Sequence, residues 1–144
     1  MGLALEEAKK AFSKNEIPVG AVIVKDGEVI GSGHNEKETL KDATLHAEMS
    51  AIREASTTLD AWRLIDSTIY VTLEPCIMCM GALIQSRVKR LVFATEDPKA
   101  GACGSVYDIS NEPRFNHSIE VTKGVLKDEA SSILKDFFTK LRSR

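Results

Sequence analysis

The fold is decided by residues 68–79, TIYVTLEPCIMC, in which a β-rich run passes straight into a pair of cysteines. Six residues with many β-branched side chains predict a strand. Pro75 suits the first position of a helix, because its missing N–H would have no partner there anyway. The apolar residues after it predict a helix that leads to a second strand, residues 90–94, which we expect to be parallel to the first.

The remainder of the chain supplies the other elements of an α/β fold. Runs 20–24 and 29–33 predict a hairpin around an Asp-Gly turn, and residues 120–123 predict a short last strand. Apolar residues at helical spacing predict further helices within residues 4–12, 45–59 and 126–141. We therefore expect a three-layer α-β-α sandwich around a five-stranded mixed sheet. With 144 residues, 43% of them hydrophobic, the chain should form a single domain, 1–144.

Cysteine usage predicts a protein of the cytoplasm. Cys76, Cys79 and Cys103 are an odd number of cysteines, which argues against a disulfide framework. The first residues are charged and amphipathic, and no apolar run reaches the length of a membrane span. We expect no membrane association, and no part for Cys103 in the chemistry.

The charge distribution is mildly asymmetric. The net charge of −2, from 19 basic and 21 acidic residues, does not indicate a nucleic-acid-binding protein. Residues 123–144 nevertheless hold six basic and three acidic side chains, a local charge of +3. Such a tail is compatible with a nearby phosphate backbone, although a charged C-terminal helix is more often a solvated surface.

One group of residues is suited to a hydrolytic metal site. The motif His46-Ala47-Glu48 is followed, 27 residues after its glutamate, by Pro75 and the cysteine pair. Cys76 and Cys79 are three apart, so a helix would present both sulfurs to one point. With His46 they make three ligands, and a catalytic zinc takes three protein ligands and keeps a fourth position for water. The pattern predicts a catalytic zinc site.

Glu48 is the acid that this ligand set leaves free. Two thiolates and a neutral imidazole cancel the formal charge of zinc, so the bound water is less acidified than on three histidines. Glu48 can take a proton from that water and return it to the substrate. On a regular helix His46 and Glu48 would face nearly opposite ways, so we expect the metal off the start of this helix, with Thr44 as its N-cap.

Each motif alone has another interpretation. An isolated Cys-x-x-Cys can be a redox dithiol, and an isolated His-x-Glu can belong to a capped surface helix. In one short chain, His-x-Glu followed by Pro-Cys-x-x-Cys is the signature of zinc deaminases. The combination favours hydrolytic deamination of a nucleobase.

Over nearly its full length the chain resembles the bacterial-type tRNA-specific adenosine deaminases of the cytidine deaminase superfamily. Besides the two motifs, the matching segments are 17–24, 63–66, 70–79, 86–88, 97–99, 115–117 and 124–138. The stretch 70–79 and the double phenylalanine 137–138 resemble the tRNA-acting branch more closely than the free-base or nucleoside enzymes. The resemblance implies a cytidine deaminase-like fold, one Zn²⁺ per subunit on His46, Cys76 and Cys79, and a homodimer.

The activity that the resemblance implies is hydrolytic deamination of adenosine to inosine at the wobble position of a tRNA anticodon. The target base of the anticodon stem-loop would be splayed out into the pocket, where zinc-bound hydroxide would attack C6. Glu48 would protonate N1 and then transfer a proton to the departing amine.

The resemblance also implies contacts between the RNA and six residues: Asn35, Ala47, Asp97, Lys99, Phe138 and Arg142. The first two would lie at the nucleotide, the next two on a loop, and the last two on the C-terminal helix. Each residue also has an interpretation that involves no RNA. Asn35 can simply be a turn residue, and Asp97 and Lys99 can belong to a solvated loop. Phe138 and Arg142 can lie at the edge of the core or on a plain surface.

Other functions remain open at this point. A free-base or nucleoside deaminase acting on guanine or cytosine would need no RNA. A zinc-stabilised RNA-binding subunit without catalysis would typically have lost the carboxylate that Glu48 supplies. A thiol redox protein would form a disulfide between Cys76 and Cys79 and would carry no stoichiometric zinc.

Four positions depart from the family's usual residues without removing a ligand: Leu45, Met80, Ala94 and Thr95. They could change the width of the pocket or the fit of the flanking nucleotides, so the exact RNA target is less well defined than the chemistry. The apolar residues 80–84 offer a surface for the implied homodimer.

Overall fold

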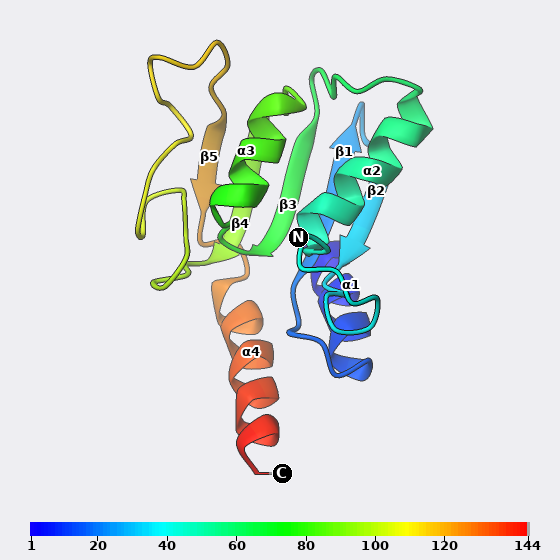
Figure 1. Ribbon diagram of the computed structural model, residues 1–144, viewed down its shortest axis with the longest axis vertical. Helices are drawn as coiled ribbons and strands as arrows, with labels where there is room; N and C mark the ends of the chain where they lie inside the picture. The colour runs from blue at the N-terminus through cyan, green and yellow to red at the C-terminus, as the bar shows by residue number, and fades with distance from the viewer. Residues whose placement is uncertain (144) are drawn as a thin grey trace.

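The computed structural model describes residues 1–143, and Arg144, counted above in the basic tail, lies outside the described residues. Five strands form one sheet in the order β2-β1-β3-β4-β5 (Figure 1). They are β1 (Gly20–Lys25), β2 (Glu28–His34), β3 (Thr68–Leu73), β4 (Arg90–Thr95) and β5 (Glu120–Lys123). β1 is antiparallel to β2 and β3, whereas β3, β4 and β5 run parallel. The predicted five-stranded mixed sheet is confirmed.

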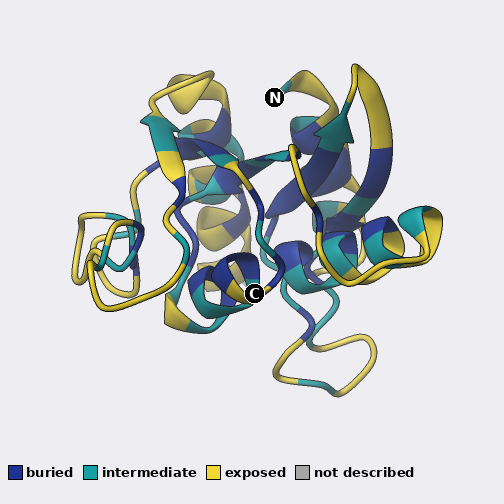
Figure 2. Ribbon diagram, turned by 90° about the horizontal axis from the view of Figure 1, so that it is seen from above, coloured by how far each residue is buried: buried dark blue, intermediate teal, exposed yellow. Residues whose placement is uncertain are grey.

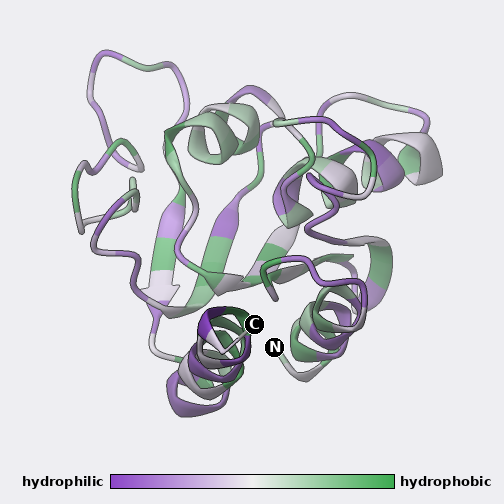
Figure 3. Cartoon of the chain, turned by 60° about the horizontal axis from the view of Figure 1, so that its bottom comes forward, coloured by the Kyte–Doolittle hydropathy of each residue, from purple (hydrophilic) through white to green (hydrophobic). Residues whose placement is uncertain are grey.

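Four helices cover the two faces of this sheet. They are α1 (Gly2–Ser13), α2 (Ala47–Leu59), α3 (Ile77–Gln85) and α4 (Lys127–Arg142). Helix α1 packs against β1 and α4, whereas α2 packs against β2 and α3. Figure 3 shows α1 and α4 on one side of the sheet and α2 and α3 on the other. The predicted α-β-α sandwich is therefore confirmed. None of the described helices has the length and apolar character needed to cross a membrane.

The core lies between the sheet and the helices, and Figure 2 shows the central strands mostly buried, whereas the loops, parts of the edge strands and the outer faces of the helices are exposed. Ile23, Ile69, Leu91 and Phe93 of the strands are almost wholly buried, as is Leu83 of α3. Burial of their apolar surface supplies the main stabilising contribution to the fold. It also makes the sheet a rigid support for the loops at its edge.

Two glycines allow the helices to lie close to the sheet. A Cβ atom on Gly20 would stand 2.0 Å from the carbonyl oxygen of Ala4 in α1. One on Gly31 would stand 2.4 Å from the carbonyl oxygen of Ala51 in α2. No real Cβ atom can approach oxygen so closely, so these positions require glycine. The close contact at Gly31 fixes where α2 lies on β2.

The predicted hairpin is confirmed, and the geometry of its turn explains why Asp and Gly occupy the turn positions. Asp26 and Gly27 form a two-residue loop between β1 and β2, with φ values of +52° and +76°. Positive φ at both central residues defines the type I′ turn, whose twist matches that of paired strands. Aspartate and glycine are among the residues that adopt this conformation most readily.

Two predicted helix starts were wrong. The N-cap of α2 is His46 rather than Thr44, whose hydroxyl donates instead to Asp42 Oδ1 at 2.7 Å. The N-cap of α3 is Cys76, so Pro75 precedes the helix instead of opening it. Cys76 forms an isolated β-bridge with Gly101, which keeps this backbone extended for three residues beyond β3.

The long segment between β4 and β5 forms no helix or strand. Residues 96–119 contain only turns and isolated bridges, including Cys76 to Gly101 and Cys103 to Asp108. Its first part lies against the residues that follow β3, because the N–H of Ala102 donates to the carbonyl oxygen of Pro75 at 2.9 Å. This end of the sheet is where α/β proteins commonly build their sites.

Candidate metal and catalytic site

Two helix N-termini bring three metal-ligating side chains together. His46 is the N-cap of α2 and Cys76 the N-cap of α3, while Cys79 lies in the first turn of α3. His46 Nδ1 is 3.6 Å from Cys76 Sγ and 3.5 Å from Cys79 Sγ. Among the described residues these three form the one group of His, Cys, Asp or Glu whose ligand atoms all lie within 4.8 Å of one another.

The spacing of these atoms suits a tetrahedral cation. A nitrogen at about 2.1 Å and a sulfur at about 2.3 Å from a tetrahedral zinc lie about 3.6 Å apart. The two measured separations of 3.6 and 3.5 Å between His46 Nδ1 and the sulfurs match that value. One imidazole and two thiols are also donors that zinc prefers. The residues present therefore fit such an ion without rearrangement.

The two thiols differ in their acidity. Hydrogen bonds from Cys79 and from His46 outweigh the effect of burial and together lower the pKa of Cys76 to about 4. The hydrogen bond between the two cysteines, together with burial, raises the pKa of Cys79 above its usual range. At neutral pH Cys76 is thus a thiolate, the form of cysteine that binds metals.

Glu48 supplies a buried carboxyl beside these ligands. It is the second residue of α2, and its exposed fraction is 3%. Burial penalises the charged form and raises the pKa of Glu48 to about 7. A carboxyl that titrates near neutral pH can both accept and donate a proton under physiological conditions. This property fits a proton carrier better than a structural ion pair.

A cavity of about 300 Å³ opens onto this group. Its walls come from the loop before β1, the loop between β2 and α2, the end of β3 and the start of the 96–119 segment. They are Ile17, Val19, Asn35, Lys37, His46, Ala47, Glu48, Leu73, Glu74, Cys76, Asp97 and Ala100. This volume is at the small end of the range for ligand pockets, and it suits one nucleobase rather than a duplex.

Three of the six predicted contact residues line this cavity, namely Asn35, Ala47 and Asp97. Asn35 also closes a turn, since its Oδ1 accepts the N–H of Lys37 at 3.3 Å. Asp97 does the same on the opposite wall, where its Oδ1 accepts the N–H of Lys99 at 3.0 Å. For Asn35 the turn interpretation and the cavity position therefore hold together, and Asp97 likewise both lines the cavity and closes a turn of its loop.

The other three predicted contact residues lie in a second hollow. Lys99, Phe138 and Arg142 line a space of about 560 Å³ between the 97–100 loop and α4. Lys135 and residues Leu134 and Thr139 complete its walls. The ring of Phe138 is 37% exposed and stands edge-on to Phe137, with centroids 5.4 Å apart. Residues of the 97–100 loop line both the cavity and this second hollow. The six predicted contact residues are therefore divided between two neighbouring surfaces.

Glu74 is a buried carboxylate that sequence reasoning did not single out. Its oxygens accept the N–H groups of Asp97 at 3.0 Å, Cys103 at 2.9 Å and Ser105 at 3.2 Å, and also the Ser105 hydroxyl. Burial raises the pKa of Glu74, but these hydrogen bonds outweigh it and leave the pKa below its ordinary value. Glu74 therefore stays charged and anchors the loop that carries Asp97.

Glu16 plays the same part on the other side of the cavity. Its exposed fraction is 1%, and its carboxylate accepts the N–H of Glu38 at 3.1 Å, the N–H of Thr39 at 2.6 Å and the Thr39 hydroxyl at 2.5 Å. It thereby holds the segment that follows Asn35. No local pattern around residue 16 indicates these partners, because they lie more than 20 residues further along the chain.

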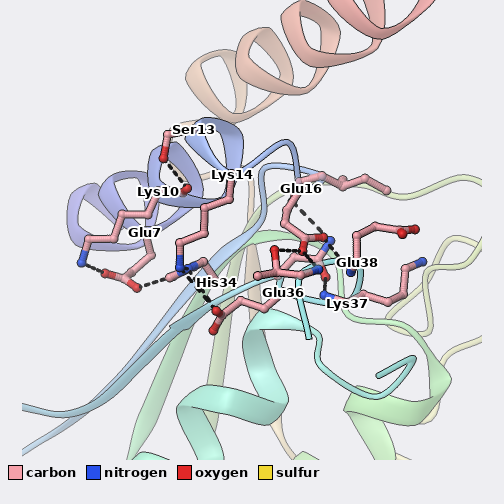
Figure 4. Close-up of polar contacts among 12 residues, drawn as sticks. Glu7, Lys10, Ser13, Lys14, Glu16, His34, Glu36, Lys37 and Glu38 are labelled. Carbon is pink, nitrogen blue, oxygen red and sulfur yellow. Dashed lines mark hydrogen bonds and ion pairs between the residues drawn. The ribbon is translucent and has the colours of Figure 1, made fainter. Parts of the chain in front are cut away.

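A chain of polar contacts ties α1 to the end of β2 (Figure 4). His34 Nδ1 is 3.1 Å from Glu7 Oε1, and His34 Nε2 is 2.9 Å from the Lys14 ammonium. Since an ammonium can only donate, Nε2 must accept and Nδ1–H must donate to the Glu7 carboxylate. Lys14 also pairs with Glu36 at 3.3 Å. These contacts fix the residue immediately before Asn35.

Comparisons with known proteins agree with this geometry. The model of the MafB19-like deaminase family matches residues 1–142. The tRNA-specific adenosine deaminase of Bacillus subtilis is 49% identical over 141 residues, which are 98% of this chain and 88% of that protein. The guanine deaminase of Nitrosomonas europaea has a solved structure that is 27% identical, with a TM-score of 0.80 over 96% of this chain and 82% of that one.

A further solved structure comes from a study of A-to-I editing by tRNA:A34 deaminases at the wobble position of transfer RNA. It is 42% identical to this chain, covers 93% of it and 97% of its own length, and superposes with a TM-score of 0.89. Both its sequence identity and its TM-score exceed those of the guanine deaminase. The chain therefore belongs to the family of tRNA-specific adenosine deaminases.

Proposed function

We propose that this protein hydrolytically deaminates adenosine to inosine at the wobble position of a tRNA anticodon. The observation that carries the proposal is the spacing of His46 Nδ1 from the sulfurs of Cys76 and Cys79, beside the buried carboxyl of Glu48. The Bacillus subtilis relative, named a tRNA-specific adenosine deaminase, supports adenosine in tRNA as the substrate.

His46, Cys76 and Cys79 would hold one Zn²⁺ per subunit. Such an ion, when bound, supplies the Lewis acidity that activates a water molecule for attack on the base. With three such side chains, an ion bound there would keep a position for water, as a catalytic rather than a structural zinc requires.

Glu48 carries the protons of the reaction. It takes one from the attacking water and donates it to N1 of the adenine, which makes C6 more electrophilic. It then transfers the remaining proton of that water to the C6 amine, so that ammonia leaves and inosine remains. Its pKa of about 7 suits both directions of transfer. Low solvent exposure keeps bulk water from competing for these protons.

The cavity and the second hollow would share the substrate. Asn35, Ala47 and Asp97 line the space for the extruded base, which anticodon loops expose at little cost because their bases are partly unpaired. In the second hollow, the exposed ring of Phe138 offers a stacking surface for a neighbouring base. Lys99 and Arg142 beside it would pair with phosphates of the anticodon stem-loop.

We also infer a homodimer that works in the cytoplasm, where its tRNA substrate would be found. Of the expected dimer surface at 80–84, Met80 and Leu83 are buried in the core, whereas Gly81 and Ile84 line a hollow. The exposed apolar side chains on this side are Ile77 and Phe115, which are 55% and 46% exposed and line one hollow with Gly81. We place the dimer contact there, since exposed apolar patches commonly mark protein interfaces.

A free-base or nucleoside deaminase acting on guanine or cytosine is the weaker alternative. Two guanine deaminases with solved structures are 27% and 33% identical to this chain, against 42% for the tRNA:A34 deaminase. A separate hollow lined with basic and aromatic side chains would also have no use in an enzyme for a single free base.

The test is to sequence transcribed tRNA after incubation with the wild type and with Glu48→Ala. We expect inosine, read as guanosine, at the wobble position with the wild type and none with the variant, with equal zinc in both. Glu54→Ala, on the exposed surface of the same helix, is the matched control and should retain activity. Turnover of free bases or nucleosides without any reaction on tRNA would overturn the proposal.

A further inference from the structure

Lys37 is the one lysine or arginine among the residues that line the cavity. The remaining charged side chains of that wall, apart from the ligands, are the acids Glu48, Glu74 and Asp97. Lys37 is half-buried. Figure 4 draws no contact to its ammonium, and within residues 1–143 this group has neither a hydrogen bond nor an ion pair. An unpaired cation at the wall of a pocket is a place where an anion can bind.

The backbone around Lys37 is held firmly. Its N–H donates to Asn35 Oδ1 at 3.3 Å, and its carbonyl accepts the N–H of Asp42 at 3.1 Å. Glu16 binds the next two residues through their N–H groups, as described above. The nearby Lys14, by contrast, is already engaged with Glu36 and His34. Lys37 is thus positioned by its neighbours. Its charge helps to lower the pKa of the Glu16 carboxyl, but no carboxylate among the described residues forms an ion pair with its ammonium.

A nucleic acid would supply the missing anion. A nucleotide whose base enters the cavity brings two backbone phosphates, one on each side, toward its rim. Proteins meet such phosphates with lysine and arginine, and these contacts set register and affinity rather than sequence preference. Lys99 and Arg142 lie across the 97–100 loop, in the second hollow. On the wall formed by residues 35–46, Lys37 is the one lysine or arginine that can meet a phosphate.

We infer that Lys37 is a further substrate-binding residue, whose ammonium pairs with a backbone phosphate adjacent to the nucleotide held in the cavity. Glu16 acts as a positioning residue by holding the segment that carries Lys37. The inference rests on the proposed function, because a free base or nucleoside has no such phosphate.

The experiment compares Lys37→Gln, Lys37→Glu and Lys37→Arg on an anticodon stem-loop RNA over a series of salt concentrations. Lys41→Glu is the matched control, because Lys41 is exposed in the same loop and does not line the cavity. We expect Lys37→Gln to raise KM about five- to tenfold, with kcat much less affected, and Lys37→Glu to raise it more. The salt dependence of log kcat/KM should become shallower by about 0.7 to 1, the loss of one phosphate contact. Lys37→Arg should stay near the wild type.

A neutral methylphosphonate in the RNA identifies the partner. Placed at one of the two phosphates that flank the target adenosine, it should weaken binding to the wild type and have no further effect on Lys37→Gln. An unchanged KM and salt slope in Lys37→Gln, or an equal loss in Lys41→Glu, would overturn the inference while leaving wild-type deamination intact. A wild type that does not act on RNA at all would instead refute the proposed function.

Discussion

The carboxylate of Glu74 lies directly against the α-carbon of Gly101. A Cβ atom at residue 101 would stand 2.3 Å from the carboxyl carbon of Glu74. The same carboxylate accepts hydrogen bonds from Asp97, Cys103 and Ser105. Residue 101 must therefore be glycine for the loop to close over this buried charge, and the loop in turn forms one wall of the cavity.

Gly101→Ala should destabilise the protein by roughly 1–3 kcal/mol, because the added methyl group displaces Glu74 from its hydrogen bonds. Deamination should fall with it, since Asp97 and Ala100 lose their support. Gly2→Ala is the control: its Cβ meets nothing within 4 Å at the start of α1, and alanine favours helix, so stability should stay equal or rise by up to about 1 kcal/mol. Urea unfolding of both variants measures the difference, and equal effects would contradict the role given to Glu74.

Glu16→Gln should change how stability depends on pH. Burial raises the pKa of Glu16, but hydrogen bonds from Thr39 and from the N–H of Glu38 outweigh it and hold the pKa below its ordinary value of 4.5. A carboxyl whose pKa is lower in the folded state stabilises the fold above its unfolded pKa, and this contribution disappears as the pH falls through the folded pKa.

The free energy of unfolding should therefore differ by about 1–3 kcal/mol between wild type and Glu16→Gln at pH 7. This difference should shrink as the pH falls below about 4.5, the ordinary value for the group. Denaturant titrations at several pH values provide the measurement. A difference that grows on acidification would show that the carboxylate is not stabilised in the folded protein.

Metal removal should lower the thermal stability of the protein as well as its activity. His46 and Cys76 are the N-caps of α2 and α3, and neither helix has a side-chain hydrogen bond at its cap. Chelation should lower the melting temperature and speed hydrogen exchange in the first turns of both helices.

Cys79→Ser should reduce bound zinc from one per chain to nearly none, whereas Cys103→Ala should retain it, as elemental analysis can establish. Equal zinc in both variants would exclude Cys79 as a ligand.

Ile77→Glu should shift the protein from dimer to monomer in sedimentation experiments. The added charge would be buried without a partner if Ile77 and Phe115 form the dimer contact. Leu40→Glu replaces another exposed apolar residue on a different surface and should leave the mass unchanged. If both variants sediment as the wild type does, the contact lies elsewhere.

Much of the fold could be predicted because its signals are local. The turn at Asp26-Gly27 and the apolar spacing of each helix lie within a few residues, and the structure has both. The ligand set His46, Cys76 and Cys79 could be named from its spacing in the same way, and the structure brings its atoms together.

The helix starts could not be predicted to the residue, because the decisive contacts are distant. Pro75 would open a helix in isolation, but the bridge between Cys76 and Gly101 keeps it extended. Glu16 and Glu74 were missed for the same reason, since their hydrogen-bond donors lie more than 20 residues away in sequence. The residues next to a single glutamate in sequence do not indicate whether its carboxylate will be exposed to solvent or buried among backbone N–H donors.

The placement of the ligands at helix starts also determines where the chain can change length. An insertion late in α2 or α3 would extend the helix away from the site and leave His46, Cys76 and Cys79 where they are. A residue added between Leu73 and Cys76 would instead shift Cys76 away from His46, because only Glu74 and Pro75 separate it from the end of β3. The short connection before α3 therefore sets the spacing of the proposed ligands, whereas the far ends of α2 and α3 can vary in length.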